Sequence, residues 1–251
     1  LNIKIGHVES GLRSFDKNMP EEINRIITDH ISDLLFTTEE SGNVNLIKEG
    51  IDKKKIHFVG NCMIDSLKKY LGHAKELKPW LKYGLSNTSY VLVTLHRPSN
   101  VDDKESLLKY ITILNNVSIS TPILFPVHPR TLKNIEKFKL KLSESVKIIT
   151  PLPYIEFLGL LSGAKLALTD SGGIQEESTM LRVPCITLRK NTERPITIEI
   201  GTNILAGTNT KIILSEIKKI VNGDIKSSTV PELWDGKSSQ RISKIISEFI
   251  R

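Results

Sequence analysis

The run Asp-Ser-Gly-Gly-Ile-Gln-Glu-Glu at 170–177 combines residue types that can hold a nucleotide diphosphate. It follows a short apolar run, so we expect a turn from a buried strand into a helix. Ser171 suits the helix N-cap, while Gly172 and Gly173 let a ligand approach backbone amides closely. Free N–H groups at a helix start attract phosphate, and Glu177 could accept hydrogen bonds from both ribose hydroxyls. A lone Ser-Gly-Gly is more often a plain tight turn, but the full run indicates a nucleotide site.

Two histidines and two arginines also follow predicted strands. His96 and Arg97 come directly after one strand, and His128 follows the next. Open α/β sheets bind ligands at this edge, where a histidine can exchange a proton and an arginine adds fixed positive charge. Arg194 follows a later strand and could bond a diphosphate or a neighbouring carboxylate. The plain alternatives are a strand-end cap for His96 and Arg97, a satisfied loop histidine for His128 and a surface ion pair for Arg194.

Carboxylates occupy a third segment near the start of the chain. Glu9 ends the apolar run Ile3–Val8, and Glu21 and Glu22 follow Pro20, which suits the first turn of a helix. Two carboxylates from adjacent loops could act as general acid and base if partial burial raises a pKa. We interpret Glu9 as functional, because an ionisable group that ends an apolar strand needs a reason. Glu22 is interpreted as an exposed glutamate at a helix start.

The elements that position these residues alternate along the chain, which predicts parallel sheets covered on both faces. The candidate strands are Ile3–Val8, Leu34–Thr37, Ile56–Val59, Tyr90–Leu95, Ile123–Val127, Val146–Ile149, Leu166–Thr169 and Pro184–Leu188. The candidate helices are Glu21–Ser32, Glu39–Glu49, Lys104–Asn116, Thr131–Lys139, Tyr154–Ser162 and Gly173–Leu181, with an amphipathic helix at Arg241–Ile250. The region Asn61–Ser89 is interpreted as linker-like and Trp234–Lys237 as a turn.

Composition narrows the function classes. With 39% hydrophobic and 25% charged residues, the chain is typical of a soluble globular protein, and no apolar run approaches the length of a membrane span. Cys62 and Cys185 form no partner pattern, which suits a reducing cytoplasm and argues against a disulfide scaffold or a zinc site. The net charge of +7 comes with scattered lysines and only 6% aromatic residues, which argues against nucleic acid as a partner. The chain opens at Leu1 as if a strand were already under way, which suggests a fragment.

Five motifs, in order along nearly the whole chain, resemble those of the non-hydrolysing UDP-N-acetylglucosamine 2-epimerases. They are His-Val-Glu-Ser-Gly-Leu-Arg at 7–13, Pro-Glu-Glu-Ile-Asn-Arg at 20–25, His-Arg at 96–97, Asp-Ser-Gly-Gly-Ile-Gln-Glu-Glu at 170–177 and Thr-Glu-Arg-Pro at 192–195. The resemblance implies an α/β, GT-B-like fold of two Rossmann-like parallel-sheet domains with a cleft between them, the N-terminal one incomplete. The expected boundaries are 1–66, 67–236 for the UDP-binding domain, and 237–251 for a C-terminal helix that returns to the first domain.

The same resemblance implies interconversion of UDP-N-acetylglucosamine and UDP-N-acetylmannosamine for surface polysaccharide synthesis. UDP is eliminated to a 2-acetamidoglucal and added back after the C2 proton returns on the other face, without metal or nicotinamide. The implied partners are UDP, the UDP-N-acetylhexosamine and a second copy of the chain. Glu9, Glu21 and His96 would be catalytic. The implied binding residues are Arg97 for the substrate, Ser171, Gly172 and Gly173 for phosphate, Glu177 for ribose, Arg194 for the diphosphate, Leu152 and Phe157 for uracil, and His128 for a second, regulatory nucleotide sugar.

Two departures from the family pattern matter. Family members often have glutamate where this chain has Ser99, which removes a carboxylate from the His96 motif. Roughly a hundred residues expected before Leu1, with a glycine-rich loop and a further aspartate, are absent, so the chain alone is expected to bind UDP weakly and not to turn over. The alternatives are a hydrolysing epimerase, a GT-B glycosyltransferase, or an inactive UDP-sugar-binding fragment.

Overall fold

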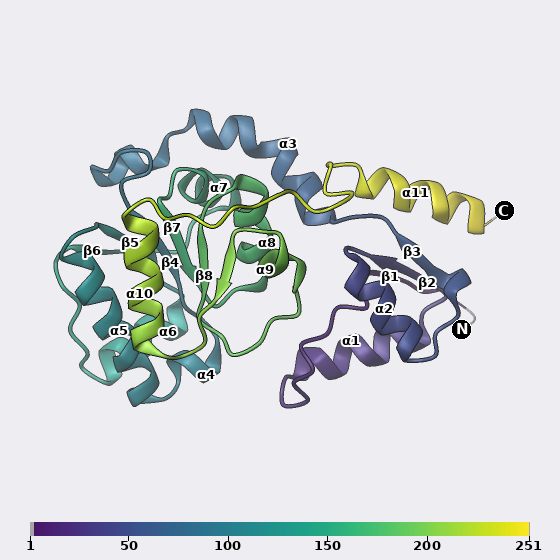
Figure 1. Cartoon of the computed structure of the whole chain (residues 1–251), viewed down its shortest axis with the longest axis horizontal. Coiled ribbons are helices and arrows are strands. Elements are labelled where there is room, and N and C mark those ends of the chain that lie inside the picture. The colour runs from purple at the N-terminus through teal and green to yellow at the C-terminus, as the bar shows by residue number, and fades with distance from the viewer. Residues whose placement is uncertain (1–2, 251) are drawn as a thin grey trace.

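The computed structural model describes residues 3–250, which form a small lobe and a large lobe (Figure 1). The small lobe holds a parallel sheet of order β1-β2-β3. Its elements in chain order are β1 (Gly6–Ser10), α1 (Pro20–Ile31), β2 (Leu34–Thr37), α2 (Glu40–Lys48), η1 (Lys53–Lys55) and β3 (Ile56–Phe58). Leu1 and Asn2, where the sequence suggested a strand under way, lie outside the described residues.

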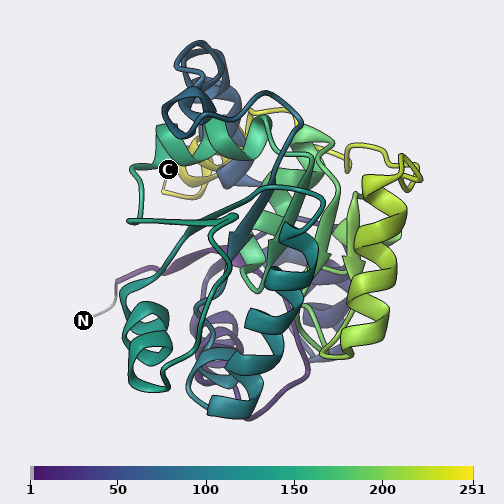
Figure 2. The same cartoon turned by 90° about the vertical axis from the view of Figure 1, so that its left-hand side faces the viewer.

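The large lobe is built on a six-stranded parallel sheet of order β6-β5-β4-β7-β8-β9. Its first elements are α3 (Cys62–Glu76), η2 (Pro79–Tyr83), β4 (Val91–Thr94), α4 (Pro98–Val101), α5 (Lys104–Ser118), β5 (Ile123–Pro126), α6 (Pro129–Lys137) and β6 (Val146–Ile149). Those that follow are α7 (Tyr154–Ser162), β7 (Leu166–Thr169), α8 (Gly172–Leu181), β8 (Cys185–Thr187), α9 (Ile196–Glu199), β9 (Asn203–Leu205) and α10 (Thr210–Val221). Helices flank the sheet on both sides (Figure 2), as expected when parallel strands are apolar on both faces.

Two apolar clusters cover the two faces of the large sheet. One joins the strands to α5 and α10, with Tyr110 and Ile213 among its buried members. The other joins them to α7 and α8, with Leu160 and Ile174 among its members. The central strand β7 is wholly buried, so its carboxyl end is held rigidly where the predicted nucleotide turn begins.

One sequence prediction about this lobe was wrong, and two of its elements were not predicted. The region Asn61–Ser89 is not a linker, because α3 fills half of it and packs against α7 through buried Ile64, Leu67 and Ala74. Its apolar residues are spaced among lysines, which masked the helical period. The sequence prediction also omitted β9 and α10. A three-residue strand such as β9 carries too few side chains to show alternation.

The first strand is displaced from its predicted position. It was expected at Ile3–Val8, but β1 runs from Gly6 to Ser10 and contains a bulge between Val8 and Ser10. β1 is an edge strand of the described sheet, and Val8 is 40% exposed. Because an edge strand is only partly buried, the run of apolar residues does not show where it begins and ends. The bulge gives Glu9 a left-handed φ of 65°.

The C-terminal segment crosses back from the large lobe to the small one (Figure 1). Trp234, predicted at the start of a turn, is fully buried, and its Nε1 donates a 3.1 Å hydrogen bond to the carbonyl oxygen of Thr38. The last helix, α11 (Ser238–Phe249), then packs Ile242 against Phe36 of the small sheet. Within residues 3–250, none of the helices has both the length and the hydrophobicity that crossing a membrane requires.

The chain passes between the lobes twice, once near Gly60 and once near Leu233. Gly60 and Gly50 provide a matched test of how tightly these two segments pack against each other. Both have a φ near 85°, but a Cβ on Gly60 would lie 2.1 Å from the carbonyl oxygen of Leu233, whereas a Cβ on Gly50 would meet nothing within 4 Å. Gly50→Ala should cost about 1 kcal/mol of unfolding free energy from the left-handed backbone alone. Gly60→Ala should cost about 1–3 kcal/mol more, because the backbone has to move. Equal losses in urea unfolding would show that the two segments do not pack in this way.

Candidate functional site

The turn after β7 has the form that the sequence predicts. Ser171 is the N-cap residue of α8, and its side chain makes no capping hydrogen bond, so the hydroxyl is available to a ligand. A Cβ on Gly172 would lie 2.7 Å from Nη1 of Arg194 and 2.8 Å from Oε1 of Glu193. Only glycine therefore fits between the start of this helix and those two charged groups. The open amides of α8 and the nearby guanidinium together suit a phosphate.

Asp170 organises the histidine motif at the end of β4. Its buried carboxylate accepts hydrogen bonds from the backbone N–H groups of His96 and Arg97 and from Nδ2 of Asn100, at 2.9–3.1 Å for one oxygen. Nδ1 of His96 lies 3.0 Å from the other oxygen, which leaves Nε2 for a ligand. Burial alone would raise the pKa of Asp170, but the contacts with His96 and the other donors lower it. The sequence pointed to the turn but gave Asp170 no role, since its partners follow a different strand.

Five of the predicted site residues surround one cavity of about 230 Å³. They are His96, His128, Leu152, Phe157 and Ser171. Its remaining walls are largely apolar, with Ile174 and prolines from two strand ends, which suits a flat base such as uracil. The ring of His128 lies 6.1 Å from that of His96, and its Nδ1 accepts a hydrogen bond from the backbone of Arg130 at the start of α6.

Glu21 and Arg97 line a second and larger cavity, of about 690 Å³, between the start of α1 and the large lobe. Since His96 and Arg97 are neighbours in the chain, the two cavities flank the same strand end. Burial lowers the pKa of Arg97, and the nearby charge of Arg189 lowers it further. The catalytic candidates Glu21 and His96 are thus brought to one edge of the large sheet.

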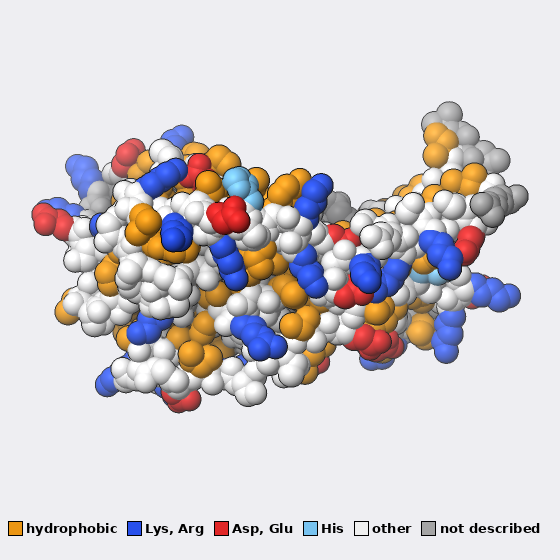
Figure 3. Space-filling view, turned by 90° about the horizontal axis from the view of Figure 1, so that it is seen from above, with side chains coloured by type: hydrophobic (Ala, Val, Ile, Leu, Met, Phe, Trp, Pro, Cys, Tyr) orange, Lys and Arg blue, Asp and Glu red, His pale blue; other side chains and the backbone are white. Residues whose placement is uncertain are grey.

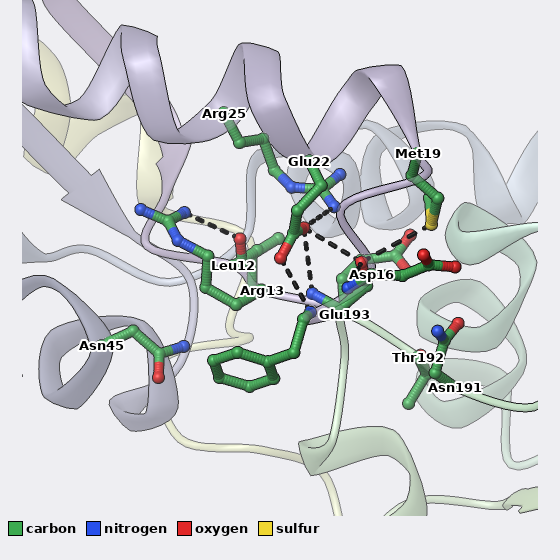
Figure 4. Close-up of polar contacts among 12 residues, drawn as sticks. Leu12, Arg13, Asp16, Met19, Glu22, Arg25, Asn45, Asn191, Thr192 and Glu193 are labelled. Carbon is green, nitrogen blue, oxygen red and sulfur yellow. Dashed lines mark hydrogen bonds and ion pairs between the residues drawn. The ribbon is translucent and has the colours of Figure 1, made fainter.

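Glu22 is buried, so its interpretation as an exposed helix-start glutamate was wrong. Its carboxylate accepts hydrogen bonds from the backbone N–H groups of Ser14 and Phe15, at 3.0 and 2.7 Å, and pairs with Arg25 (Figure 4). Burial opposes the charge, but these donors outweigh it and lower the pKa of Glu22. Glu22 thereby fixes the loop that precedes α1 and leaves Glu21 facing the cavity. A sequence shows two adjacent glutamates but not which one a distant loop will bond.

Arg194 joins the nucleotide turn to the small lobe. Its Nε lies 2.7 Å from Glu176, its Nη1 lies 2.7 Å from Glu193, and its Nη2 lies 3.6 Å from Glu9 of β1. Arg194 is therefore no surface ion pair. Burial opposes its charge, but the carboxylates outweigh burial and raise its pKa. The bulge at Glu9 directs that side chain away from the regular strand, a use of bulges that is common beside active sites.

Glu177 lies on α8, next to Glu176, and its carboxylate is close to Tyr154 and not to Arg194. Burial raises its pKa to about 7, and the neighbouring Tyr154 hydroxyl partly offsets that rise. Tyr154, which begins α7, was not among the predicted site residues. Its position three residues before Phe157 is a signal that could have found it, because the two lie on adjacent turns of one helix.

Lysine and arginine side chains are spread over the face shown in Figure 3 and do not form one patch. In residues 3–250 no group of three or more histidine, cysteine, aspartate or glutamate side chains is arranged to hold a metal ion.

The role of Glu22 can be tested against its neighbour. Glu22→Gln replaces one acceptor oxygen by a donor, so a buried N–H group loses its partner at a cost of about 1–3 kcal/mol in unfolding free energy. Glu21→Gln makes the same chemical change at an exposed position and should cost less than about 0.5 kcal/mol. Chemical unfolding measures both. Equal effects would mean that Glu22 does not hold the loop.

Comparison with known proteins shows which family the chain belongs to. A family model described as UDP-N-acetylglucosamine 2-epimerase matches residues 1–247. A Methanococcus maripaludis protein named UDP-N-acetylglucosamine 2-epimerase is 45% identical over 98% of this chain and 69% of its own length. A crystal structure of the Methanocaldococcus jannaschii UDP-GlcNAc 2-epimerase with UDP-GlcNAc and UDP has a TM-score of 0.89 at 44% identity, over 98% of this chain and 69% of that one. The Neisseria meningitidis UDP-GlcNAc 2-epimerase bound to UDP-GlcNAc has a TM-score of 0.86 at 28% identity, over 98% and 70%.

The expected fold class is confirmed by these neighbours and by the two parallel sheets. The likeness extends over nearly the whole chain and includes both lobes. The chain belongs to the UDP-N-acetylglucosamine 2-epimerase family.

Proposed function

We propose that this protein interconverts UDP-N-acetylglucosamine and UDP-N-acetylmannosamine. The observation that carries the proposal is the contact of Arg194 with Glu9, because it brings a carboxylate of the small lobe to the phosphate turn of the large one. A diphosphate at that turn would hold its sugar near Glu9 and Glu21. Proton transfer at a sugar carbon and departure of a diphosphate then occur in one site.

The proposed reaction begins with elimination. One of the carboxylates, Glu9 or Glu21, removes the C2 proton, a C1–C2 double bond forms, and the C1–oxygen bond breaks with its electrons on UDP. Arg194 and the amides at the start of α8 stabilise the charge on the departing diphosphate. The other carboxylate, whose proton exchanges with solvent, then delivers a proton to C2 on the opposite face, and an oxygen of UDP adds back to C1. Asp170 orients His96 so that Nε2 can contact the diphosphate during elimination.

The binding roles are proposed on the same geometry. Uracil lies against Phe157 and Leu152 in the smaller cavity, phosphate meets Ser171, and Arg97 contacts the substrate from the neighbouring strand end. For Glu177 we propose that the ribose hydroxyls join or replace Tyr154. A regulatory role for His128 stays a prediction.

Four wider features are proposed from the family resemblance. They are a domain division at 1–66, 67–236 and 237–251, a homodimer, a cytoplasmic location and a role in surface polysaccharide synthesis. Packing of α11 against the small sheet supports assigning the C-terminal helix to the first domain.

We expect the full-length protein in D₂O to convert UDP-N-acetylglucosamine into its manno epimer with solvent deuterium at C2. Deuterium enters because the C2 proton leaves and is replaced during each turnover. Proton NMR over time follows both the new epimer and the loss of the C2 signal.

Other outcomes identify the alternatives. Stoichiometric free UDP with free N-acetylmannosamine would indicate a hydrolysing epimerase. Sugar transfer to an added acceptor would indicate a glycosyltransferase. Binding of UDP with no deuterium at C2 would indicate a UDP-sugar-binding protein without epimerase activity.

A further inference from the structure

Glu176 is a fully buried carboxylate on α8 that the proposed chemistry does not use. Its Oε1 accepts a 2.8 Å hydrogen bond from Nδ2 of Asn61, and its Oε2 lies 2.7 Å from Nε of Arg194. The second contact is a close ion pair and not a directed hydrogen bond. A buried charge is costly unless it is paired, so the position of this carboxylate needs a reason.

The guanidinium of Arg194 offers that reason, because it meets a different carboxylate at each nitrogen. Nε faces Glu176, Nη1 faces Glu193 and the phosphate turn, and Nη2 faces Glu9. A guanidinium is planar with a rigid fork of donors, so fixing two of its nitrogens fixes the direction of the third. The contact across the lobe boundary to Glu9 therefore depends on the partners of Nε and Nη1.

The two buried partners are not equivalent. The charge of Glu193 is shared, since it also lies 2.7 Å from Arg189 and 3.8 Å from Arg97. Among the described residues, the cation paired with Glu176 is Arg194. Burial raises the pKa of Glu176 to about 7, and the charge of Arg194 opposes that rise, so each group supports the charge of the other.

We propose that Glu176 is a positioning residue that acts through Arg194 and keeps one edge of the guanidinium against Glu9 of the small lobe. The inference rests on the proposed function, in which Glu9 is an acid/base group. Asn61 connects Glu176 to the start of α3, where the chain passes from the small lobe to the large one. Its Oδ1 caps α3 by accepting from the N–H of Met63, while its Nδ2 holds Glu176.

A double-mutant cycle tests whether Glu176 acts through Arg194. Glutamine at 176 keeps the volume and can still accept from Asn61, but it carries no charge. Glu176→Gln should lower kcat for epimerisation about tenfold with KM changed less than about threefold, because the group does not touch substrate. In an Arg194→Lys background, where the fork is already lost, the same change should have no further effect.

A second readout does not require turnover. The Nε–H of Arg194, followed by NMR, should exchange with solvent at least about tenfold faster in Glu176→Gln than in the unsubstituted protein. If the unsubstituted protein shows no epimerisation, the proposed function fails, and this exchange rate still decides the positioning role.

Two further variants control for charge and folding. Glu136→Gln removes a charge from an exposed position on α6 and should change neither readout. Asn61→Ser can still cap α3 but no longer donates to Glu176, so it should lower kcat in the same direction and covers the case in which Glu176→Gln does not fold. An equal loss of kcat from Glu176→Gln with Arg194 present and in the Arg194→Lys background, or unchanged exchange of the Arg194 Nε–H, would overturn the inference.

Discussion

The guanidinium of Arg194 lies where the two lobes meet, surrounded by carboxylates from three parts of the chain. Glu9, Glu176 and Glu193 would repel one another if that charge were absent, because all three lie close to it and two of them, Glu176 and Glu193, are buried. Burial raises the pKa of Glu193, but the charges of Arg194 and Arg189 outweigh it and lower this pKa to about 2. The phosphate turn depends on the same group, since Gly172 has no room for a side chain beside it. One cation thus sets the spacing between the proposed nucleotide site and the proposed acid/base site.

The topology explains how residues so distant in sequence come together. All strands of the large sheet are parallel, so their carboxyl ends share one edge, and β4 and β7 deliver His96 and Asp170 there as neighbours. The small lobe then supplies carboxylates from outside this sheet. Its bulge directs Glu9 toward Arg194, and the buried Glu22 leaves Glu21 facing the larger cavity.

Much of the large lobe could be predicted from the sequence because most of its strands are short apolar runs. The predicted limits of Val146–Ile149 and Leu166–Thr169 coincide with β6 and β7. Contacts between side chains that are far apart in the sequence could not be predicted in this way. Whether Glu21 or Glu22 faces inward depends on a loop that folds back from Ser14, and the surroundings of Arg194 depend on Glu9, which belongs to the other lobe. Motif spacing indicated which residues matter but not which of them contact one another.

The most direct test of this account is a crystal structure of the protein with UDP bound. We expect phosphate oxygens within hydrogen-bond distance of the amides at Gly172 and Gly173, with uracil against Phe157 and Arg194 still directed at Glu9. UDP bound elsewhere, or Arg194 turned away from Glu9 while the diphosphate occupies the turn, would contradict the central claim that one arginine links the two sites.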